Sequence, residues 1–600
     1  MSPKKTTFSS VVLAPILREL PFFVIIFLLL GSRALSGIHS QLADPSSGGN
    51  NWLSLSGETA ICFLMSYLLT ALVAAVDKRW LKVLLYALVL FLFGVTEFLQ
   101  YNFDMKINSQ ALTLLLETNT REASGFMQTF LFSSGSIRTY VLVIGALAVI
   151  LIAEWWWHRR HREFHSPTLR RVLASVVSAA LCGGLCSSLC YIRIFGYDNN
   201  DQLNNQERKD VVYPSDPISL LAQSCYSLHL AGRETRTALE TNRHLKPSTT
   251  TESDSLSLVL IIGESFNKWH ASAYGYPLNT TPHLCSEAAA GRLVLFDDAV
   301  TPMSLTSPSM KHMLCCNSYS DGERWYESAY IPAVFKSAGY DVLFWDNQKY
   351  LKPFADFSFC INSFIFDKEM TGLSYDQLNE RGYSYDYPLV SNFARTPHPN
   401  GKHQLVMFHL MGQHSPPGAR YPHVKEFDVF TADSIHRSEP YLTPAKRQMI
   451  AEYDNSTLYN DHVVNAIFDL YRDRNAVVVY LSDHGEETYD YKDGIWRKYE
   501  GLDAQWLRHI HNIPFMVWCS DIYLARHPEM RSSLAEASHR PFSIDNLCHI
   551  LFHLGGLQTP YYLADRDVLS PQFRPRPRLV EGKDDFVKAD YDAVMRSAKD

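Results

Sequence analysis

The sequence predicts a chain in two parts: an N-terminal bundle of five transmembrane helices, then an α/β domain with a mainly parallel, doubly wound sheet. Nearly all long apolar runs fall before about residue 195, although the mean hydropathy of the whole chain is only −0.11. After that point short apolar runs alternate with helical stretches, which is the pattern of βαβ units. Two of these apolar runs end in Glu264 and in Asp483-His484, which are residue types that bind metals.

Five segments approach the ~20 apolar residues that cross a bilayer. They are Val11–Ala34, Thr59–Val76, Leu81–Leu99, Tyr140–Trp157 and Val172–Ile192. Buried core helices of a soluble protein are a weak alternative, because these runs are long and poor in charge. A cleaved signal peptide does not fit either, because four runs follow the first. The sequence therefore predicts a multi-pass membrane domain over residues 1–195.

Basic residues orient the predicted spans. Lys4-Lys5 precede the first span, Lys78-Arg79 lie between the second and third, and an arginine cluster over 159–171 lies between the fourth and fifth. Because cytoplasmic loops are enriched in Lys and Arg, these three places indicate a cytoplasmic N-terminus. An odd number of spans then delivers the rest of the chain to the opposite side. In a Gram-negative bacterium this predicts an inner-membrane protein with a periplasmic domain.

Residues 196–250 are interpreted as a polar linker followed by a bridging helix from Pro217 to about Arg243. This helix either lies along the membrane surface or packs on the soluble domain, and the pattern favours neither. The soluble domain is predicted over 251–572, with residues 573–600 as a C-terminal tail. Its predicted strands are Leu256–Ile262, Leu293–Phe296, Asp341–Trp345, Gln404–His409, Ala476–Leu481 and Pro514–Trp518, and its predicted helices lie near Pro332–Ser337, Thr443–Tyr471 and Ile544–Leu554.

Charge and cysteine content narrow the function classes. The net charge of −7 arises from 55 basic and 62 acidic residues, so no basic surplus is available to neutralise a nucleic acid. Seven of the 11 cysteines fall outside the predicted spans, and sequence alone does not pair them. No CxxC pattern indicates a cysteine zinc site.

Metal-binding side chains follow two of the predicted strands. Strand Leu256–Ile262 closes with Gly263-Glu264-Ser265, and strand Ala476–Leu481 closes with Ser482-Asp483-His484. Ligands bind at the carboxyl ends of the strands in open α/β sheets. We therefore expect Glu264, Asp483 and His484 to converge on one cation, with the mixture of ligands that zinc accepts.

A hydroxyl-rich segment, Val300–Met310, opens a predicted helix. One of its Ser or Thr residues is a candidate metal-activated nucleophile, because helix N-termini bind phosphate and metals lower the pKa of a bound hydroxyl. An ordinary N-cap is the alternative for any single hydroxyl. His414, His509 and His511 lie at strand ends or mouths, which suggests second-metal or phosphate-stabilising roles. The stretch Glu117–Ser124 is either a capped helix or a lipid head-group contact, and spacing alone favours the helix.

Several motifs together resemble one family. They are Gly263-Glu264-Ser265, Tyr274-Gly275-Tyr276-Pro277, Thr280-Thr281-Pro282, Tyr453-Asp454-Asn455-Ser456, Ser482-Asp483-His484-Gly485-Glu486 and Ile513-Pro514-Phe515. In this order they resemble the phosphoethanolamine transferases, membrane-anchored members of the alkaline phosphatase superfamily. Glu117–Ser124, Trp345–Gln348 and Arg508-His509 resemble most closely the branch that modifies the core heptose of lipopolysaccharide. The resemblance covers essentially the whole chain.

The resemblance implies an alkaline phosphatase/sulfatase-like fold and a set of site residues. The nucleophile is expected at Thr306, which with Glu264, Asp483 and His484 binds zinc. His414 and His509 are expected to act in catalysis near the phosphoryl group and in substrate binding. Thr118 and Glu122, which match residues implicated in holding the lipid donor, and Asn347 are further expected substrate-binding residues, so the resemblance favours a head-group contact for Glu117–Ser124. One tight zinc site is expected, with a second left open.

The implied reaction has two steps. Thr306 attacks the phosphorus of phosphatidylethanolamine, and lipopolysaccharide then takes phosphoethanolamine from the threonine, with core heptose as the expected acceptor. A monomer in contact with inner-membrane lipids is expected, with no nucleic acid partner.

Alternatives are a periplasmic phosphodiesterase or phosphatase, a transferase that acts on lipid A or periplasmic glucans, and a non-catalytic sensor. Sulfatase activity is disfavoured, because Met310 stands where the sulfatase signature has an arginine. Pro302 and His312 replace a disulfide that flanks the nucleophile in lipid A-modifying members.

Overall fold

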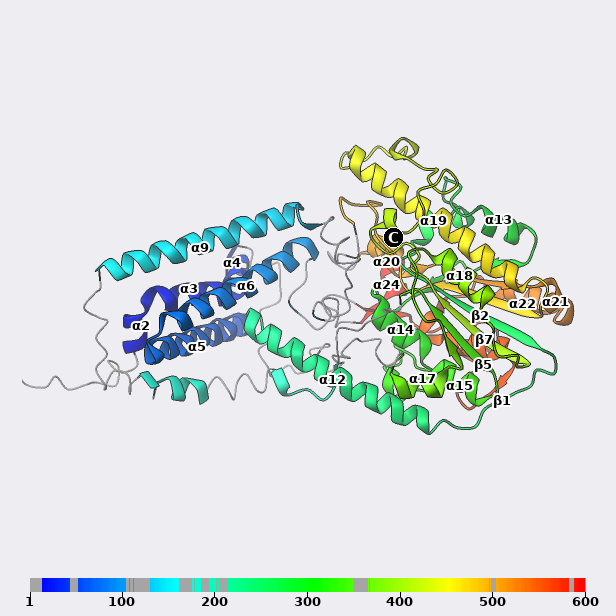
Figure 1. The fold of residues 1–600 in the computed structure, drawn as a ribbon, viewed down its shortest axis with the longest axis horizontal. Helices are drawn as coiled ribbons and strands as arrows, with labels where there is room; N and C mark the ends of the chain where they lie inside the picture. The colour runs from blue at the N-terminus through cyan, green and yellow to red at the C-terminus, as the bar shows by residue number, and fades with distance from the viewer. Residues whose placement is uncertain are drawn as a thin grey trace, which may run out of the picture. The chain divides into compact units, whose positions relative to one another are not determined.

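The computed structural model describes residues 13–43, 52–103, 107, 112, 130–160, 175–176, 178–184, 194–200, 203, 214–348, 365, 367–495, 497, 503–581 and 588–598. The chain forms two compact units, drawn in Figure 1. The first comprises Met1–Thr118 with Phe126–Ala231, and the second comprises Asn119–Gly125 with Gly232–Asp600. Helix α12 (Pro217–Arg243) has residues in both units. The boundaries predicted from sequence stay predictions.

The first unit is helical. Its helices are α2 (Ala14–Arg18), α3 (Leu20–Leu30), α4 (Ser32–Ala43), α5 (Trp52–Val76), α6 (Arg79–Phe103) and α9 (Ser134–Arg160). Within the described ranges, three helical stretches are long and apolar enough to cross a membrane: Leu55–Val76, Arg79–Asn102 and Ser134–Arg160. The pair Leu20–Leu30 and Ser32–His39, bent by 63°, gives a fourth if it counts as one span. The predicted fifth span, Val172–Ile192, lies largely outside the described residues, so five spans stay a prediction.

Charged side chains inside this unit are paired. Lys82 Nζ lies 2.8 Å from a Glu19 oxygen and 2.6 Å from a Glu154 oxygen. Glu58 accepts hydrogen bonds from the backbone N–H groups of Ser215 and Asp216, directly before α12 begins. Because unpaired charges are costly in an apolar environment, these contacts account for the polar residues within otherwise apolar helices.

The second unit is built on a seven-stranded mixed sheet with the order β3-β10-β8-β2-β7-β5-β6. The strands are β2 (Leu256–Gly263), β3 (Leu293–Leu295), β5 (Asp341–Asp346), β6 (Gln377–Leu378), β7 (His403–His409), β8 (Ala476–Ser482) and β10 (Phe515–Cys519). The neighbours from β8 to β6 are parallel, and β10 pairs antiparallel with both β8 and β3. The predicted α/β class is confirmed, and all six predicted strands are present.

Helices cover both faces of this sheet (Figure 1). Leu258, Leu260 and Ile262 of β2 pack in one core with helices α14 (Thr306–Leu314), α15 (Ile331–Ser337) and α23 (Leu547–Leu554). Val259 and Ile261 point to the other core, with α13 (Pro282–Ala289), α18 (Asp386–Arg395) and α19 (Pro444–Tyr471). Alternate residues of a strand face opposite sides, so a strand covered on both faces is an unbroken apolar run. This explains why the central strands were easy to predict.

Shorter elements complete the unit. They are β1 (Thr249–Thr250), β4 (Ala299–Val300), β9 (Asn512–Ile513), β11 (Phe542–Ser543), β12 (Leu557–Gln558), β13 (Leu579–Val580), β14 (Ala589–Asp590), α17 (Lys368–Ser374), α20 (Ala504–Ile510), α21 (Asp521–Arg526), α22 (Met530–Ala537) and α24 (Tyr591–Ser597). Beyond residue 572 the chain still packs on this unit. A nitrogen of Arg578 lies 2.8 Å from an oxygen of Asp298, and Glu581 accepts a 2.7 Å hydrogen bond from the N–H of Ser304. These contacts fix the segment that leads into α14.

Candidate active site

Strands β2 and β8 bring the predicted metal ligands together. The two strands are parallel and pair Gly263 with Ser482, so Glu264 and Asp483 leave the sheet side by side. Glu264, Asp483 and His484 are fully buried, and one ligand atom from each lies within 4.8 Å of the others. His484 Nε2 lies 3.2 Å from Asp483 Oδ2 and 3.4 Å from Glu264 Oε1. We call these three residues the first cluster.

The hydroxyl of Thr306 faces the first cluster. Thr306 is the first residue of α14, and its Oγ1 donates a 2.9 Å hydrogen bond to Glu264 Oε2 and lies 3.3 Å from His484 Nε2. Ser309, one turn later, instead donates to the carbonyl of Asp483 at 2.7 Å. Thr306 is therefore the hydroxyl of this segment that the fold directs at the metal-binding residues, while Ser309 supports a ligand from behind.

The donor atoms of the first cluster suit a cation. Burial, together with the charge of Arg497, lowers the pKa of His484 to about 3, so its imidazole is neutral. Its Nδ1–H donates to the carbonyl of Gly485 at 2.9 Å, which leaves the lone pair on Nε2. Burial and the neighbouring Glu264 raise the pKa of Asp483 well above its usual range, and Asp483 Oδ2 has no hydrogen-bond partner among the described residues. Two buried carboxylates and an imidazole lone pair fit zinc.

His414 reaches the site on a tight loop after β7. Gly412 has φ +46°, and a Cβ there would lie 2.7 Å from the carbonyl oxygen of Glu264 and 2.9 Å from its nitrogen. The N–H of Gln413 donates to that carbonyl at 3.0 Å. Burial raises the pKa of Glu264, but positive charge at His414 and Arg497 and the hydrogen bond from Ser265 lower it below its usual range. The predicted catalytic role of His414 stays a prediction.

Two neighbouring amides have different contacts. Gln348 donates from Nε2 to Glu264 Oε2 at 3.0 Å and to the carbonyl of Leu410 at 2.9 Å. Asn347 instead donates to Asp386 Oδ1 at 2.7 Å and accepts from the N–H of Tyr383. Asp386 in turn accepts from the N–H groups that precede His414, so Asn347 supports the loop. Sequence reasoning singled out Asn347 and missed Gln348, although both belong to one motif.

Arg497 is a second residue that sequence reasoning missed. One of its terminal nitrogens lies 2.6 Å from His484 Nε2, and its Nε lies 3.8 Å from Glu486 Oε2. It stands in no strand or helix pattern, so no periodicity indicates that it faces the site. Its guanidinium therefore adds positive charge beside the first cluster.

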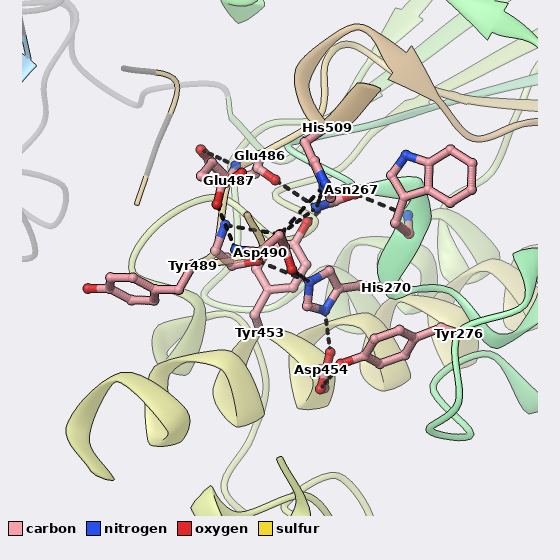
Figure 2. Close-up of polar contacts among 12 residues, drawn as sticks. Asn267, His270, Tyr276, Tyr453, Asp454, Glu486, Glu487, Tyr489, Asp490 and His509 are labelled. Atoms are coloured by element: carbon pink, nitrogen blue, oxygen red, sulfur yellow. Dashed lines mark hydrogen bonds and ion pairs between the residues drawn. The ribbon is translucent and has the colours of Figure 1, made fainter. Parts of the chain in front are cut away.

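The ring of His509 belongs to a different group of side chains, shown in Figure 2. Its Nδ1 lies 3.2 Å from Asn267 Nδ2 and 3.6 Å from Asp490 Oδ2, and the ring stacks on Tyr491. The backbone is nevertheless close to the first cluster, because a Cβ on Gly485 would lie 2.0 Å from the His509 carbonyl oxygen. The predicted catalytic role of His509 stays a prediction, and the predicted donor-binding residues Thr118 and Glu122 lie outside the described residues.

Comparisons with known proteins agree with this geometry. The sulfatase family model matches residues 257–557, half of the chain, and the model of phosphoethanolamine transferase EptA/EptB matches residues 64–221. Phosphoethanolamine transferase EptC of Escherichia coli K12 is 27% identical over 486 residues, which cover 80% of each chain. The Kdo(2)-lipid A phosphoethanolamine 7''-transferase of the same strain is 24% identical and covers 79% of this chain and 82% of its own.

Two solved structures are similar to this one. The C-terminal periplasmic domain of EptC from Escherichia coli is 26% identical with a TM-score of 0.51, and the match covers 58% of this chain and 98% of that domain. The integral membrane protein EptA from Neisseria meningitidis has a TM-score of 0.56 at 18% identity and covers 94% of this chain and 99% of its own, which shows the same fold over both units. The chain belongs to the sulfatase family and, with its EptA/EptB-like N-terminal part and these relatives, is a phosphoethanolamine transferase of the alkaline phosphatase superfamily.

Proposed function

We propose that the chain transfers phosphoethanolamine from phosphatidylethanolamine to the core heptose of lipopolysaccharide, through a covalent phosphoethanolamine-threonine at Thr306. One observation carries the proposal: the Thr306 hydroxyl lies at a helix N-terminus within hydrogen-bond reach of Glu264 and His484. A hydroxyl so placed can attack phosphorus while nearby backbone N–H groups donate hydrogen bonds to a phosphoryl oxygen.

Glu264, Asp483, His484 and Thr306 would hold the zinc ion. When bound, zinc would lower the pKa of the Thr306 hydroxyl and place positive charge beside the phosphoryl oxygens. Gln348 and Ser265 hold the carboxylate of Glu264, since Gln348 Nε2 donates to Oε2 and Ser265 Oγ donates to Oε1 at 2.6 Å. Such supporting hydrogen bonds fix the orientation of a ligand. We propose one tight zinc site here.

In the first step the Thr306 oxygen forms a bond to phosphorus, and the bond from phosphorus to the diacylglycerol oxygen breaks. The Thr306 proton is already directed at Glu264 Oε2. The departing diacylglycerol oxygen needs a proton, and the protonated ring of His414 would supply it from Nε2. Its Nδ1 is held by the Ser415 carbonyl at 2.9 Å, so Nε2 is the nitrogen that exchanges protons with substrate.

In the second step the acceptor hydroxyl attacks the phosphorus, and the bond to Thr306 breaks. His414, now neutral, takes the proton of the acceptor hydroxyl, and Thr306 regains its own. Arg497 would neutralise the phosphoryl oxygens in both steps, because its guanidinium already lies against His484. The ring that gives a proton in the first step recovers it in the second, so the enzyme ends each cycle in its starting state.

The membrane unit explains how the enzyme reaches its lipid donor. Apolar helices anchor the protein in the lipid layer from which phosphatidylethanolamine comes, which raises the effective concentration of the donor. We propose a bacterial inner-membrane location, a periplasmic α/β unit, a monomer, and donor contacts at Thr118 and Glu122.

Mass spectrometry of lipopolysaccharide tests the proposal. Lipid A and core are separated from cells that carry the wild-type gene, the Thr306→Ala variant or no gene. A phosphoethanolamine increment on core alone, present only with the wild type, is expected. An increment on lipid A would keep the reaction and replace the acceptor. No increment on either, together with free phosphoethanolamine released from the donor, would establish the hydrolase alternative instead.

A further inference from the structure

A second group of metal-binding side chains lies in the α/β unit. Glu487, Asp490 and His509 each offer a ligand atom within 4.8 Å of the others. We call them the second cluster, and Figure 2 shows how they point toward one another. Glu487 and Asp490 lie on the loop after β8, whereas His509 lies on α20, so the cluster joins two segments of the chain.

The second cluster contains a buried acceptor that no donor satisfies among the described residues. Glu487 Oε2 has no hydrogen-bond partner in this part of the chain, although Glu487 is fully buried. Asn267 Nδ2 lies 2.9 Å from the carbonyl of Glu486, 3.1 Å from Asp490 Oδ2 and 3.2 Å from His509 Nδ1. Leaving a buried acceptor unsatisfied is costly, and a cation would satisfy it.

The surrounding contacts prepare each group to act as a ligand. Asp490 Oδ1 lies 2.9 Å from His270 Nε2 and 3.3 Å from Arg437, while Oδ2 faces Asn267 and His509 and also accepts a 3.1 Å hydrogen bond from the Thr488 hydroxyl. His509 Nδ1 lies 3.6 Å from Asp490 Oδ2, so a lone pair on this nitrogen would be directed toward the carboxylate. Second contacts of this kind commonly orient metal ligands.

Glu487 distinguishes the two ways to satisfy this cluster. Its Oε1 accepts a 2.6 Å hydrogen bond from the N–H of Asp490, while Oε2 has no donor among the described residues. Without a cation, a proton on the carboxyl group would be the other way to satisfy Oε2. A bound cation would instead hold it ionised. The protonated and the cation-bound states predict different effects of Glu487→Gln. The substitution should leave stability equal or greater if Glu487 is simply protonated, and it should reduce the zinc content if Glu487 binds a cation.

We propose that Glu487, Asp490 and His509 bind a divalent cation of the zinc class, at a site separate from the first cluster. Two carboxylates and one imidazole are ligands that zinc accepts. The cation would tie the loop after β8 to α20, both of which adjoin the first cluster through the hydrogen bond from Gly485 N–H to the Ile510 carbonyl at 2.7 Å. Its role is to stabilise the loop that carries the catalytic ligands, and it does not depend on the identity of the acceptor.

Metal content of the full-length protein in detergent tests the proposal. After equilibration with zinc chloride and gel filtration, the wild type is expected to hold about two zinc ions per chain, and His484→Ala and Glu487→Gln about one each. The double variant is expected to hold none. Glu439→Gln is the matched control, because Glu439 accepts from Arg437 without belonging to the cluster. Zinc should raise the unfolding temperature of His484→Ala but not of the double variant.

Two results would overturn the proposal. One is a Glu487→Gln variant with the zinc content of the wild type and equal or greater stability, as expected for a glutamate that is simply protonated. If that variant does not fold, anomalous diffraction at the zinc edge from wild-type crystals decides the question. A peak among Glu487, Asp490 and His509 supports the site, and a peak at the first cluster alone rules it out.

Discussion

The two clusters have nearly the same composition but different surroundings. Each has two carboxylates and one histidine within 4.8 Å. The first cluster faces a threonine hydroxyl at the start of α14 and an arginine, whereas in the second Asp490 is held by ion pairs to His270 and Arg437. A ligand set alone therefore does not define an active site. The first cluster is distinguished by a hydroxyl at a helix N-terminus that faces its ligands. The hydroxyl and the arginine beside the second cluster, Thr488 and Arg437, both contact Asp490 instead.

Removing the attacking oxygen should have the largest effect. Thr306→Ala is expected to lower transfer by at least about 10⁴-fold, because both steps pass through the Thr306 oxygen. Intact-protein mass spectrometry after incubation with phosphatidylethanolamine should show a phosphoethanolamine adduct on the wild type and none on the variant. Ser307→Ala, one residue further along α14, is the control and should keep the adduct. An adduct on Thr306→Ala would place the nucleophile elsewhere.

Arg497 tests whether the positive charge serves catalysis. Arg497→Met is expected to lower kcat/KM by about 30-fold, because one charge-assisted contact to the phosphoryl group is lost. The same variant should retain zinc more tightly against a chelator, because Arg497 no longer competes for His484 Nε2. Arg447→Met, in which the lost arginine contacts the Ile435 carbonyl, is a control of the same chemistry. Loss of both zinc and activity would mean that Arg497 supports the site structurally.

Substitution of Gln348 should lower activity by a smaller factor. Gln348→Leu removes the hydrogen bond to Glu264 and is expected to lower activity by about 10-fold with weaker zinc binding at the first cluster. Gln348→Glu should be worse, because it places a third carboxylate beside Glu264. Zinc titration of the His509→Asn background, where only the first cluster remains, measures this effect directly. An unchanged zinc affinity in Gln348→Leu would contradict the positioning role.

The smallest effect is a pH dependence of stability that arises beside the second cluster. His270 lies between Asp454 and Asp490, at 2.6 and 2.9 Å. Burial opposes protonation, but these two carboxylates raise the pKa of His270 from 6.5 to about 10. The pKa of His270 is higher in the folded state than in the unfolded state. The ion pairs of protonated His270 therefore stabilise the fold fully below pH 6.5, and this stabilisation is lost as the pH rises toward 10.

Thermal unfolding between these pH values measures this contribution. The metal-free wild type should lose stability across the window, and His270→Gln should lose less. His244→Gln, an exposed position, serves as the control and should behave as the wild type. A wild type whose stability is flat across the window would show that His270 stays neutral in the fold.

The sequence predicted the parts of the site that the sheet determines. Glu264, Asp483 and His484 directly follow buried strands, so the pairing of β2 with β8 was enough to bring them together. The resemblance to the transferase family then placed Thr306, which the segment of hydroxyls alone left open. Gln348 and Arg497 were missed because neither side chain's direction follows from a period of 2 or 3.6 residues. For the same reason the sequence placed His509 near the phosphoryl group without revealing its contact with Asp490.

The contacts of Arg578 and Glu581 have a consequence for biosynthesis. The loop before α14 is held by residues synthesised more than half a chain after Glu264. The catalytic unit therefore cannot finish folding while the ribosome is still making its last strands, and a chain interrupted before residue 578 would leave the nucleophile segment unsupported.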